Sequence, residues 1–360
     1  MRLQFSALFL AGVFVVMLDS SCSFAFLVSS SPSVPHSSTR RLAKKGGGGG
    51  FGAKATKPKK VSKEAMLKQV KKKYGGTSAQ EIAQGTQKQI DRAMSELPPH
   101  LQVATQLYQQ LLKWDSYVST LSILQQSNLP PAELEGATLA REQLDQLCAE
   151  HQLTTADLHN TLQRITWDAS ADAKVARSLT GNMPLHIAER VDKACAYVGQ
   201  GRCLDVGCGY GVLVPNLLKA GVRASQITGV DLSPEMIRNA QLLHPGVEFV
   251  ATDFGAFTDE TGFDAILFCA ALHDLPDAKA ALTKAASLLR PNGVIVIVHP
   301  QGNSHVLAQS KANPILVQRG LPTTEELEAL DLGLSLVVAP AAAGTPDETR
   351  DGYLAVLQKL

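Results

Sequence analysis

The spacing of apolar positions changes along the chain and divides it into regions. Between residues 62 and 179, apolar side chains recur at helical spacing, as at Leu101, Ala104 and Leu107. Between residues 180 and 360, short apolar runs alternate with helical stretches. Strands that alternate with helices predict a mainly parallel sheet that is covered by helices on both faces.

Seven runs in the region 180–360 have the length and composition of buried strands. They are Cys203–Val206, Ile227–Asp231, 247–251, Phe263–Cys269, 293–299, Leu334–Val338 and 352–357. The sequence therefore predicts an α/β domain over 180–360, preceded by an α-helical region over 62–179.

The helical region carries clear helix-start signals and no visible chemistry. Ser78 with Glu81, and Thr154 with Asp157, have the spacing of capping boxes. Four or five amphipathic helices are expected, either as a small bundle or packed against the α/β domain. Trp167 is expected to anchor a core. The region could also present a surface to a protein partner.

The first residues have the order of regions found in a secretory signal peptide. A 14-residue apolar run, 5–18, follows Arg2 and ends in the small residues 20–23. A run of this length is too short to cross the ~30 Å core of a bilayer comfortably. Residues 1–23 are therefore expected to be a signal peptide, with a buried core helix as the alternative, and no membrane span is expected after its removal.

Residues 24–61 have the composition of a transit peptide followed by a Gly/Lys-rich linker. No acid occurs between Ser20 and Lys63, whereas Ser, Lys and Arg abound. With Phe24 just behind the small residues, the two segments resemble the bipartite presequences of algae with plastids of secondary origin. The resemblance implies a disordered presequence and import into the plastid (chloroplast) stroma. Secretion is the alternative location.

Charge is distributed unevenly between the presequence and the rest of the chain. Residues 1–75 hold 14 of the 34 Lys and Arg and only two acids, a net charge of +12. The remaining residues hold 20 Lys and Arg against 31 Asp and Glu, a net charge of −11. Because binding of nucleic acid depends on neutralising phosphates with Lys and Arg, no nucleic-acid partner is expected.

The six cysteines show neither a CxxC pair nor Cys/His ligand spacing, so no metal site is expected. They are interpreted as reduced thiols of a reducing compartment.

A glycine-rich turn directly follows the first strand of the α/β domain. Gly207, Gly209 and Gly211 let the chain reverse tightly and let its backbone approach a ligand. Asp231 ends the next strand, where its carboxylate could accept hydrogen bonds from a ribose diol. This arrangement is typical of a Rossmann-like nucleoside site.

The turn departs from the dinucleotide fingerprint, whose third glycine comes three residues after the second. Here position 212 is Val, and Asp205 lies within the strand, two residues before Gly207. A carboxylate at that position is unfavourable beside a pyrophosphate but suits an ammonium group. The Lys-Ser/Thr pair of a phosphate-binding P-loop is also missing. An NAD-linked oxidoreductase remains a weaker alternative.

These motifs, in order along residues 180–360, resemble those of class I S-adenosylmethionine-dependent methyltransferases. The resemblance rests on 204–211, 229–231, 252–254 and the strand Phe263–Cys269 with the residues after it. It implies a seven-stranded sheet whose last strand, 352–357, is antiparallel. It also implies S-adenosylmethionine as the cofactor.

The resemblance assigns cofactor-binding roles to ten residues. Gly207, Cys208, Gly209 and Gly211 would face the methionine part, with Asp205 near its amino group and Cys269 bounding it. Asp231 would bind the ribose hydroxyls, and Leu232, Asp253 and Phe254 would contact the adenine.

The methyl acceptor is expected to be a small molecule, with a protein side chain as the second choice. No [DN]-P-P-[YF] motif or Pro-Cys pair follows the fourth strand, which disfavours methylation of nucleic-acid bases. The domain 180–360 is acidic, with 13 Lys and Arg against 19 Asp and Glu.

His273 follows the fourth strand and is the candidate catalytic base, since the usual pKa of histidine suits removal of a proton. His299 and His305, after the fifth strand, could line the acceptor pocket. A plastid assembly or regulatory factor that retains the cofactor fold is the competing prediction. It would use the helical region as its working surface.

Overall fold

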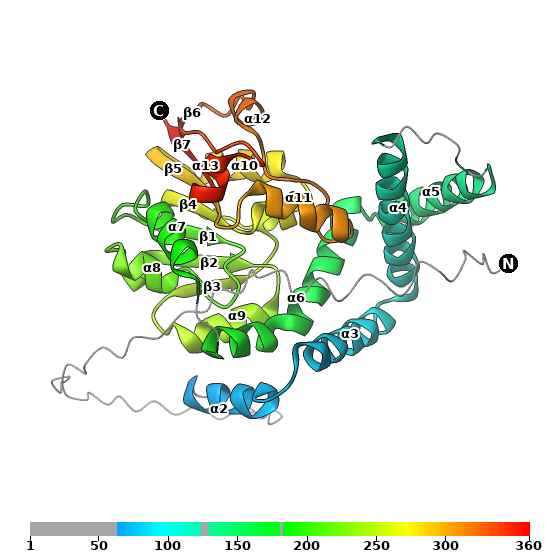
Figure 1. The fold of residues 1–360 in the computed structure, drawn as a ribbon, viewed down its shortest axis with the longest axis horizontal. Helices are drawn as coiled ribbons and strands as arrows, with labels where there is room; N and C mark the ends of the chain where they lie inside the picture. The colour runs from blue at the N-terminus through cyan, green and yellow to red at the C-terminus, as the bar shows by residue number, and fades with distance from the viewer. Residues whose placement is uncertain (1–62, 124–128, 130, 181–182) are drawn as a thin grey trace, which may run out of the picture.

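The computed structural model describes residues 63–360 except 124–128, 130 and 181–182. The predicted signal peptide and transit peptide lie outside the described residues. The strands are β1 (Cys203–Val206), β2 (Ile227–Asp231), β3 (Glu248–Ala251), β4 (Phe263–Cys269), β5 (Leu289–His299), β6 (Leu334–Val338) and β7 (Tyr353–Lys359). The order in the single seven-stranded sheet is β3-β2-β1-β4-β5-β7-β6 (Figure 1).

Strand directions confirm the predicted Rossmann-like sheet with an antiparallel last strand. Strands β1 to β5 pair in parallel, whereas β7 runs antiparallel to both of its neighbours, β5 and β6. Strand β5 begins at Leu289, before the predicted 293–299, and β7 ends at Lys359, beyond the predicted 352–357. The carboxyl ends of β1 to β4 therefore share one edge of the sheet, where ligands bind in open α/β folds.

The α/β domain also contains seven helices among its described residues. They are α7 (Leu185–Cys195), α8 (Val214–Lys219), α9 (Pro234–Leu243), α10 (Ala278–Leu288), α11 (Asn303–Ala312), α12 (Thr324–Glu328) and α13 (Pro346–Asp351). Short 3-10 turns precede β2 and follow β3 and β4, at Ala224–Gln226, Phe254–Ala256 and Leu272–Asp274.

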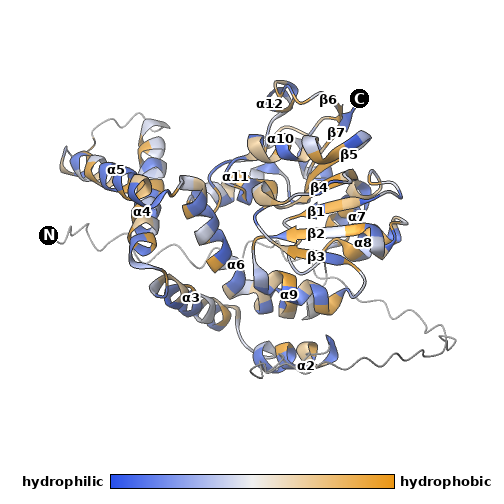
Figure 2. Ribbon diagram, turned by 180° about the vertical axis from the view of Figure 1, so that it is seen from behind, coloured by the Kyte–Doolittle hydropathy of each residue, from blue (hydrophilic) through white to orange (hydrophobic). Residues whose placement is uncertain are grey.

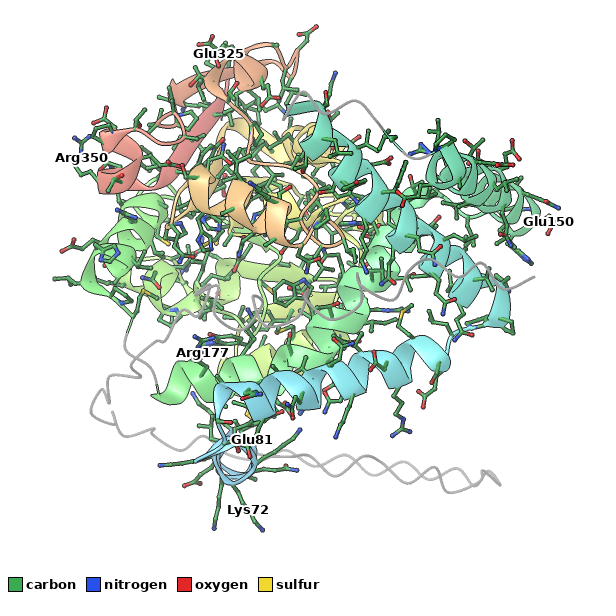
Figure 3. All side chains as sticks on the ribbon, turned by 45° about the vertical axis from the view of Figure 1, so that its right-hand side comes forward. Lys72, Glu81, Glu150, Arg177, Glu325 and Arg350 are labelled. Atoms are coloured by element: carbon green, nitrogen blue, oxygen red, sulfur yellow. The ribbon has the colours of Figure 1, made fainter. Side chains whose placement is uncertain are left out.

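Both faces of the sheet are buried. Successive side chains of a strand point to opposite faces, and on each face they belong to a different buried apolar cluster. Along β4, Ala265 and Leu267 pack in the cluster that includes α7, α8 and α9. Ile266 and Phe268 pack in the cluster that includes α10 and α11. Figure 2 shows the strands as the most apolar part of the ribbon. Charged side chains such as Lys72 extend outward from the helices (Figure 3).

The region before the sheet is helical, as predicted. It forms α2 (Lys63–Tyr74), α3 (Ala79–Ser95), α4 (Pro99–Ile123), α5 (Pro131–His151) and α6 (Thr155–Thr180). The predicted capping box at Ser78 and Glu81 is present at the start of α3. At α6, the Asp157 backbone N–H donates to Thr154 Oγ1, and the Thr154 N–H donates to the Asp157 carboxylate.

Helix α6 joins the helical region to the sheet. Its Leu158 and Leu162 belong to the same buried cluster as Phe268 of β4 and Tyr108 of α4. The helices therefore pack against the α/β domain rather than forming a separate bundle. Among the described helices, none is both long and apolar enough to cross a bilayer.

Candidate active site

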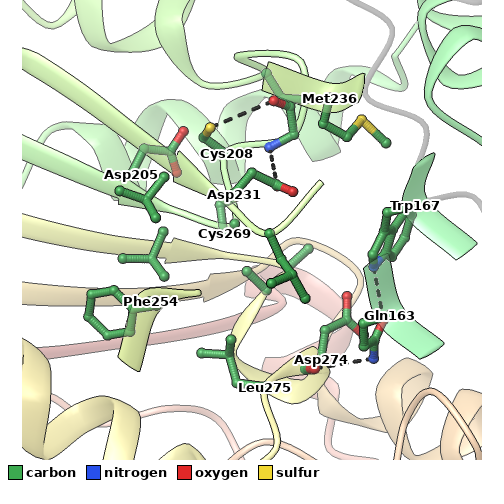
Figure 4. A pocket seen from close by; sticks show the side chains of 18 of the residues that line it. Gln163, Trp167, Asp205, Cys208, Asp231, Met236, Phe254, Cys269, Asp274 and Leu275 are labelled. Carbon is green, nitrogen blue, oxygen red and sulfur yellow. Dashed lines mark hydrogen bonds between the residues drawn. The ribbon is translucent and has the colours of Figure 1, made fainter. Parts of the chain in front are cut away.

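A pocket opens at the carboxyl ends of β1 to β4, and α6 forms its opposite wall (Figure 4). The space between its lining atoms is about 1080 Å³, solvent at its mouth included. Of the predicted cofactor residues, nine line it: Asp205, Gly207, Cys208, Gly209, Asp231, Leu232, Asp253, Phe254 and Cys269.

The glycine turn forms the floor of the pocket beside β1. The N–H groups of Gly207 and Cys208 both donate to the carbonyl of Val230 in β2, at 2.8 and 3.1 Å. Gly207 has φ +69°. A Cβ atom there would lie 2.5 Å from the Cβ of Ala271, so only glycine fits. The turn is thereby held close against β2 and the segment after β4.

Gly211 was predicted in the cofactor site but does not line the pocket. A Cβ at this position would meet the rings of His244 and Phe249, at 2.6 and 3.2 Å. Its φ is +81°, which favours glycine in its own right. This glycine therefore serves the turn and the packing beneath it, behind the ligand.

Asp231 links the glycine turn to the start of α9. One carboxylate oxygen accepts from the Gly209 N–H and the other from the Ser233 N–H, each at 2.8 Å. Burial raises the pKa of Asp231 to about 6, although these two backbone hydrogen bonds act in the opposite direction. The side chain is fixed by the backbone before any ligand is bound.

Asp205 is a buried carboxyl group with an unsatisfied oxygen. Its residue is 2% exposed, and Oδ2 has no hydrogen-bond partner among the described residues. Burial, with the nearby charge of Asp231, raises the pKa of Asp205 to about 8. A buried acceptor without a hydrogen-bond partner is unfavourable, so this oxygen can accept from a donor group of a ligand. An ammonium group fits this position.

Asp253 and Phe254 begin the short turn after β3. Asp253 accepts from the Gly255 N–H at 3.0 Å and from Asn160 Nδ2 of α6 at 3.1 Å. Phe254 is 4% exposed and packs edge-on against Phe268, with ring centroids 5.7 Å apart. It is thus both a core residue and part of the pocket wall.

His273 is not brought to the pocket. It is buried, and its ring lies 5.2 Å from that of His299, which in turn lies 5.6 Å from that of His305. Burial lowers the pKa of His273 to about 4, so its ring is neutral near pH 7. None of these three histidines lines the pocket. Among the residues that the structure describes, no cluster of His, Cys, Asp or Glu is placed to hold a metal ion.

The contribution of α6 to the site was not predicted from the sequence. Asn160, Gln163, Trp167 and Lys174 line the pocket, so Trp167 is a wall residue rather than only a core anchor. The four positions are three, four and seven residues apart, which places them on one helical face. A face that mixes amide, aromatic and basic side chains was the signal available in the sequence.

Buried polar contacts fix α6 over the strand ends. Gln163 donates to the carbonyls of Leu316 and Asp274, at 2.7 and 3.1 Å, and accepts from Trp167 Nε1 at 2.9 Å. One turn further on, the Asp168 carboxylate accepts from Ser233 Oγ and from the Glu235 N–H, at the beginning of α9.

The pocket is lined by more acids than bases. Four carboxyl groups, those of Asp205, Asp231, Asp253 and Asp274, face one ammonium group, that of Lys174. A cationic ligand would stabilise the ionised form of these carboxyl groups, whereas a pyrophosphate would disfavour it.

Residues 204–297 match the model of a family described as "Methyltransferase domain". The matched segment contains the glycine turn and the strand ends that carry Asp231, Asp253 and Cys269. The match supports the predicted methyltransferase domain, with S-adenosylmethionine as its cofactor.

Curated relatives match a part of the chain. A ubiquinone biosynthesis O-methyltransferase from Xanthomonas axonopodis pv. citri is 32% identical over 137 residues, which is 36% of this chain and 54% of that protein. A trans-aconitate 2-methyltransferase from Enterobacter sp. is 39% identical over 112 residues, which is 30% of this chain and 44% of that protein. The chain thus spans about half the length of the curated relatives it matches.

Two solved structures illustrate the structural likeness. The magnesium protoporphyrin IX methyltransferase from Synechocystis PCC 6803 with bound SAH has a TM-score of 0.41 and 19% identity, covering 56% of this chain and 100% of that chain. The Haloferax volcanii complex of a methyltransferase activator and a methyltransferase has a TM-score of 0.43 and 22% identity, covering 54% of this chain and 96% of that chain.

Proposed function

We propose that this protein transfers a methyl group from S-adenosylmethionine to a small-molecule acceptor. The observation that carries the proposal is the charge of the pocket, in which four carboxyl groups surround a space lined by a single lysine. S-adenosylmethionine carries an ammonium and a sulfonium group, so it complements this lining, whereas NAD would bring a pyrophosphate to it.

Different residues of the pocket bind different parts of the cofactor. Asp205, with its unpaired oxygen, holds the ammonium group, and the turn at Gly207 lies along the methionine part. Asp231 receives the ribose hydroxyls. Phe254 and Asp253 hold the adenine. When bound, the cofactor supplies an activated methyl group, and the chain contributes binding and orientation, which account for much of the rate in displacement reactions.

A small acceptor is supported by the position of α6. This helix lies across the strand ends, so the site is a pocket with walls on both sides. Two of the curated relatives are also named for small molecules: one for ubiquinone biosynthesis and the other for trans-aconitate. A protein side chain is the second acceptor class.

Transfer of a labelled methyl group tests the proposal. The protein is incubated with S-adenosylmethionine that carries a deuterated methyl group and with an extract separated into small-molecule and protein fractions. Label in a small molecule is the expected result, and Asp231→Ala should abolish it. Label confined to proteins would instead identify a protein methyltransferase.

Cofactor binding without transfer to either fraction would favour the plastid assembly or regulatory factor.

The location in the plastid stroma is part of the proposal and rests on the composition of residues 1–61. Sequencing the amino terminus of the protein isolated from its source cells tests it. The mature chain should begin after residue 23, and a chain that retains Met1 would contradict the targeting.

A further inference from the structure

Asp274 is the pocket carboxyl group that no sequence motif identified. It ends the short turn Leu272–Asp274 directly after β4, and it lines the pocket. Its side chain is 20% exposed and points into the pocket beside Gln163 (Figure 4). Within the described part of the chain, its carboxylate accepts no hydrogen bond, and the nearest cation-forming group, His273 Nε2, lies 3.6 Å away.

The backbone of Asp274 is held by buried groups of α6. His159 Nε2 donates to its main-chain oxygen at 2.8 Å, and Gln163 Nε2 donates to the same oxygen at 3.1 Å. Both donors are almost fully buried, at 1% and 3% exposure. The residue is therefore fixed through its backbone, and its carboxylate remains available to a ligand.

The strand order places Asp274 at the reactive end of the pocket. Strand β4 lies on the opposite side of β1 from β2 and β3. Asp231 and Asp253, on β2 and β3, hold the adenosine in the proposed function. The methionine part then lies over β1, and the next carboxyl group of the pocket beyond it, on the β4 side, is that of Asp274.

We propose that Asp274, rather than His273, receives the proton that a hydroxyl or amino group of the acceptor loses on methylation. This inference rests on the proposed function. A bond forms between the methyl carbon and the acceptor oxygen or nitrogen, while the carbon–sulfur bond breaks. Its electron pair stays on sulfur, which becomes a neutral thioether, and the proton passes to the Asp274 carboxylate and then to water.

The surroundings of Asp274 suit a base near neutral pH. Burial raises the pKa of Asp274 to about 7, although the charges of His159 and Lys174 on α6 act in the opposite direction. Asp231, on β2, faces it as a like charge. His273, the neighbour on its own turn, is neutral and outside the pocket. The acceptor class that needs this carboxylate carries an O–H or N–H group, since an ionised carboxylate acceptor needs no base.

Two cofactor analogues distinguish Asp274 from the other pocket acids. Sinefungin carries a protonated amine where S-adenosylmethionine carries the methylated sulfonium, whereas S-adenosylhomocysteine carries no charge there. Asp205 and Asp231 meet groups that both analogues share, so their titration cancels in the ratio of the two affinities. The ratio therefore reports the group that faces the transferred methyl.

Calorimetry of the full chain at pH 6 and pH 8 tests the proposal. If only the ionised Asp274 binds the amine, the preference for sinefungin should rise about 10-fold between these pH values, as expected for a group with a pKa near 7. Asp274→Asn and Asp274→Ser should remove this rise and weaken sinefungin about 10- to 100-fold at pH 8, the value of a charge-assisted hydrogen bond. Both should bind S-adenosylhomocysteine like the parent.

Asp277→Asn is the matched control, because Asp277 begins α10 outside the pocket and Asn also caps a helix. This variant should behave like the parent. The proposal is overturned if the Asp274 variants keep the pH-dependent preference, or if His273→Gln removes it while they do not. Failure of the parent to bind either analogue would instead contradict the proposed function itself.

Discussion

The carboxyl groups of Asp205, Asp231 and Asp274 are buried where an ionised group is poorly solvated, and burial raises the pKa of each. The folded protein thus retains protons that the unfolded chain has already released. In the ligand-free protein, the contribution of these three groups to the free energy of unfolding should therefore fall as pH rises from about 4 through about 8. A bound cation offsets this cost of ionisation, so the ionised carboxylates favour the cofactor.

Replacing Asp205 separates the two effects. Asp205→Asn removes the carboxyl group that titrates. The free energy of unfolding of the variant minus that of the parent should therefore increase by about 2–4 kcal/mol from pH 5 to pH 8. Its affinity for S-adenosylmethionine should fall about 10- to 100-fold, because the ammonium group loses a charged acceptor. Urea unfolding at the two pH values and calorimetry measure both. A variant less stable than the parent at pH 8 would contradict this assignment.

Asp231→Ala should weaken S-adenosylmethionine binding by about 30- to 1000-fold if the carboxylate accepts from both ribose hydroxyls. It should also lower the free energy of unfolding by about 1–2 kcal/mol, because the Gly209 and Ser233 N–H groups lose their acceptor. Asp264→Ala is the control, since Asp264 pairs with Arg290 away from the pocket and should affect stability alone. Parent-like affinity in Asp231→Ala would show that the cofactor site is wrongly placed.

The sequence identified Asp231 as a candidate ribose-binding residue but did not reveal its two hydrogen bonds to the backbone. Its position follows from the end of an apolar strand, which is local information. Its bonds to Gly209 and Ser233 depend on how the turn after β1 and the start of α9 meet, and that geometry comes from packing. His273 shows the same limit, because a residue after β4 can face either the pocket or the core.

At the scale of the elements, α6 determines the shape of the site. It supplies one wall of the pocket and fixes the backbone of Asp274. Helical periodicity predicted the helix, and Thr154 with Asp157 marked its start. The face that meets the strand ends was not predicted, because the docking of a helix on a sheet far along the chain leaves no local pattern.

Asp168→Ala tests the attachment of α6. The change removes the carboxylate that accepts from Ser233 Oγ and from the Glu235 N–H. It also removes a negative charge from the start of α9, so it should cost about 1–2 kcal/mol of stability. It should also speed amide exchange in α6 and weaken cofactor binding. Asp115→Ala, which loses an exposed ion pair between Asp115 of α4 and Arg141 of α5, should cost less than about 1 kcal/mol. Equal effects of the two variants would contradict the anchoring role.

The whole molecule shares a core between the helical region and the sheet. Tyr108 of α4, Leu144 of α5 and Leu162 of α6 pack in one buried cluster with Phe268. The described chain should therefore unfold in a single cooperative transition, with equal calorimetric and van't Hoff enthalpies. Two separated transitions, one for the helices and one for the sheet, would contradict a shared core.

The architecture was largely predictable because each strand is a short apolar run between turn residues. The start of β5 was not, since Pro291, Asn292 and Gly293 are typical of a turn. In the structure they lie within the strand, where Asn292 has φ +62° and the pairing with β4 shifts register between Phe263 and Ala265. Leu289 pairs with Phe263 and Val294 with Ala265, so residues 290–293 have no partner in β4. The local turn preference is thus kept as an irregularity within the strand.

The central claim is that the pocket of this protein binds S-adenosylmethionine and not a dinucleotide. Titration calorimetry of the purified protein with S-adenosylmethionine and with NAD, under the same conditions, tests it most directly. The glycine turn, the unpaired oxygen of Asp205 and the four pocket carboxyl groups predict binding of S-adenosylmethionine and weak or no binding of NAD. Tighter binding of NAD than of S-adenosylmethionine would contradict the account.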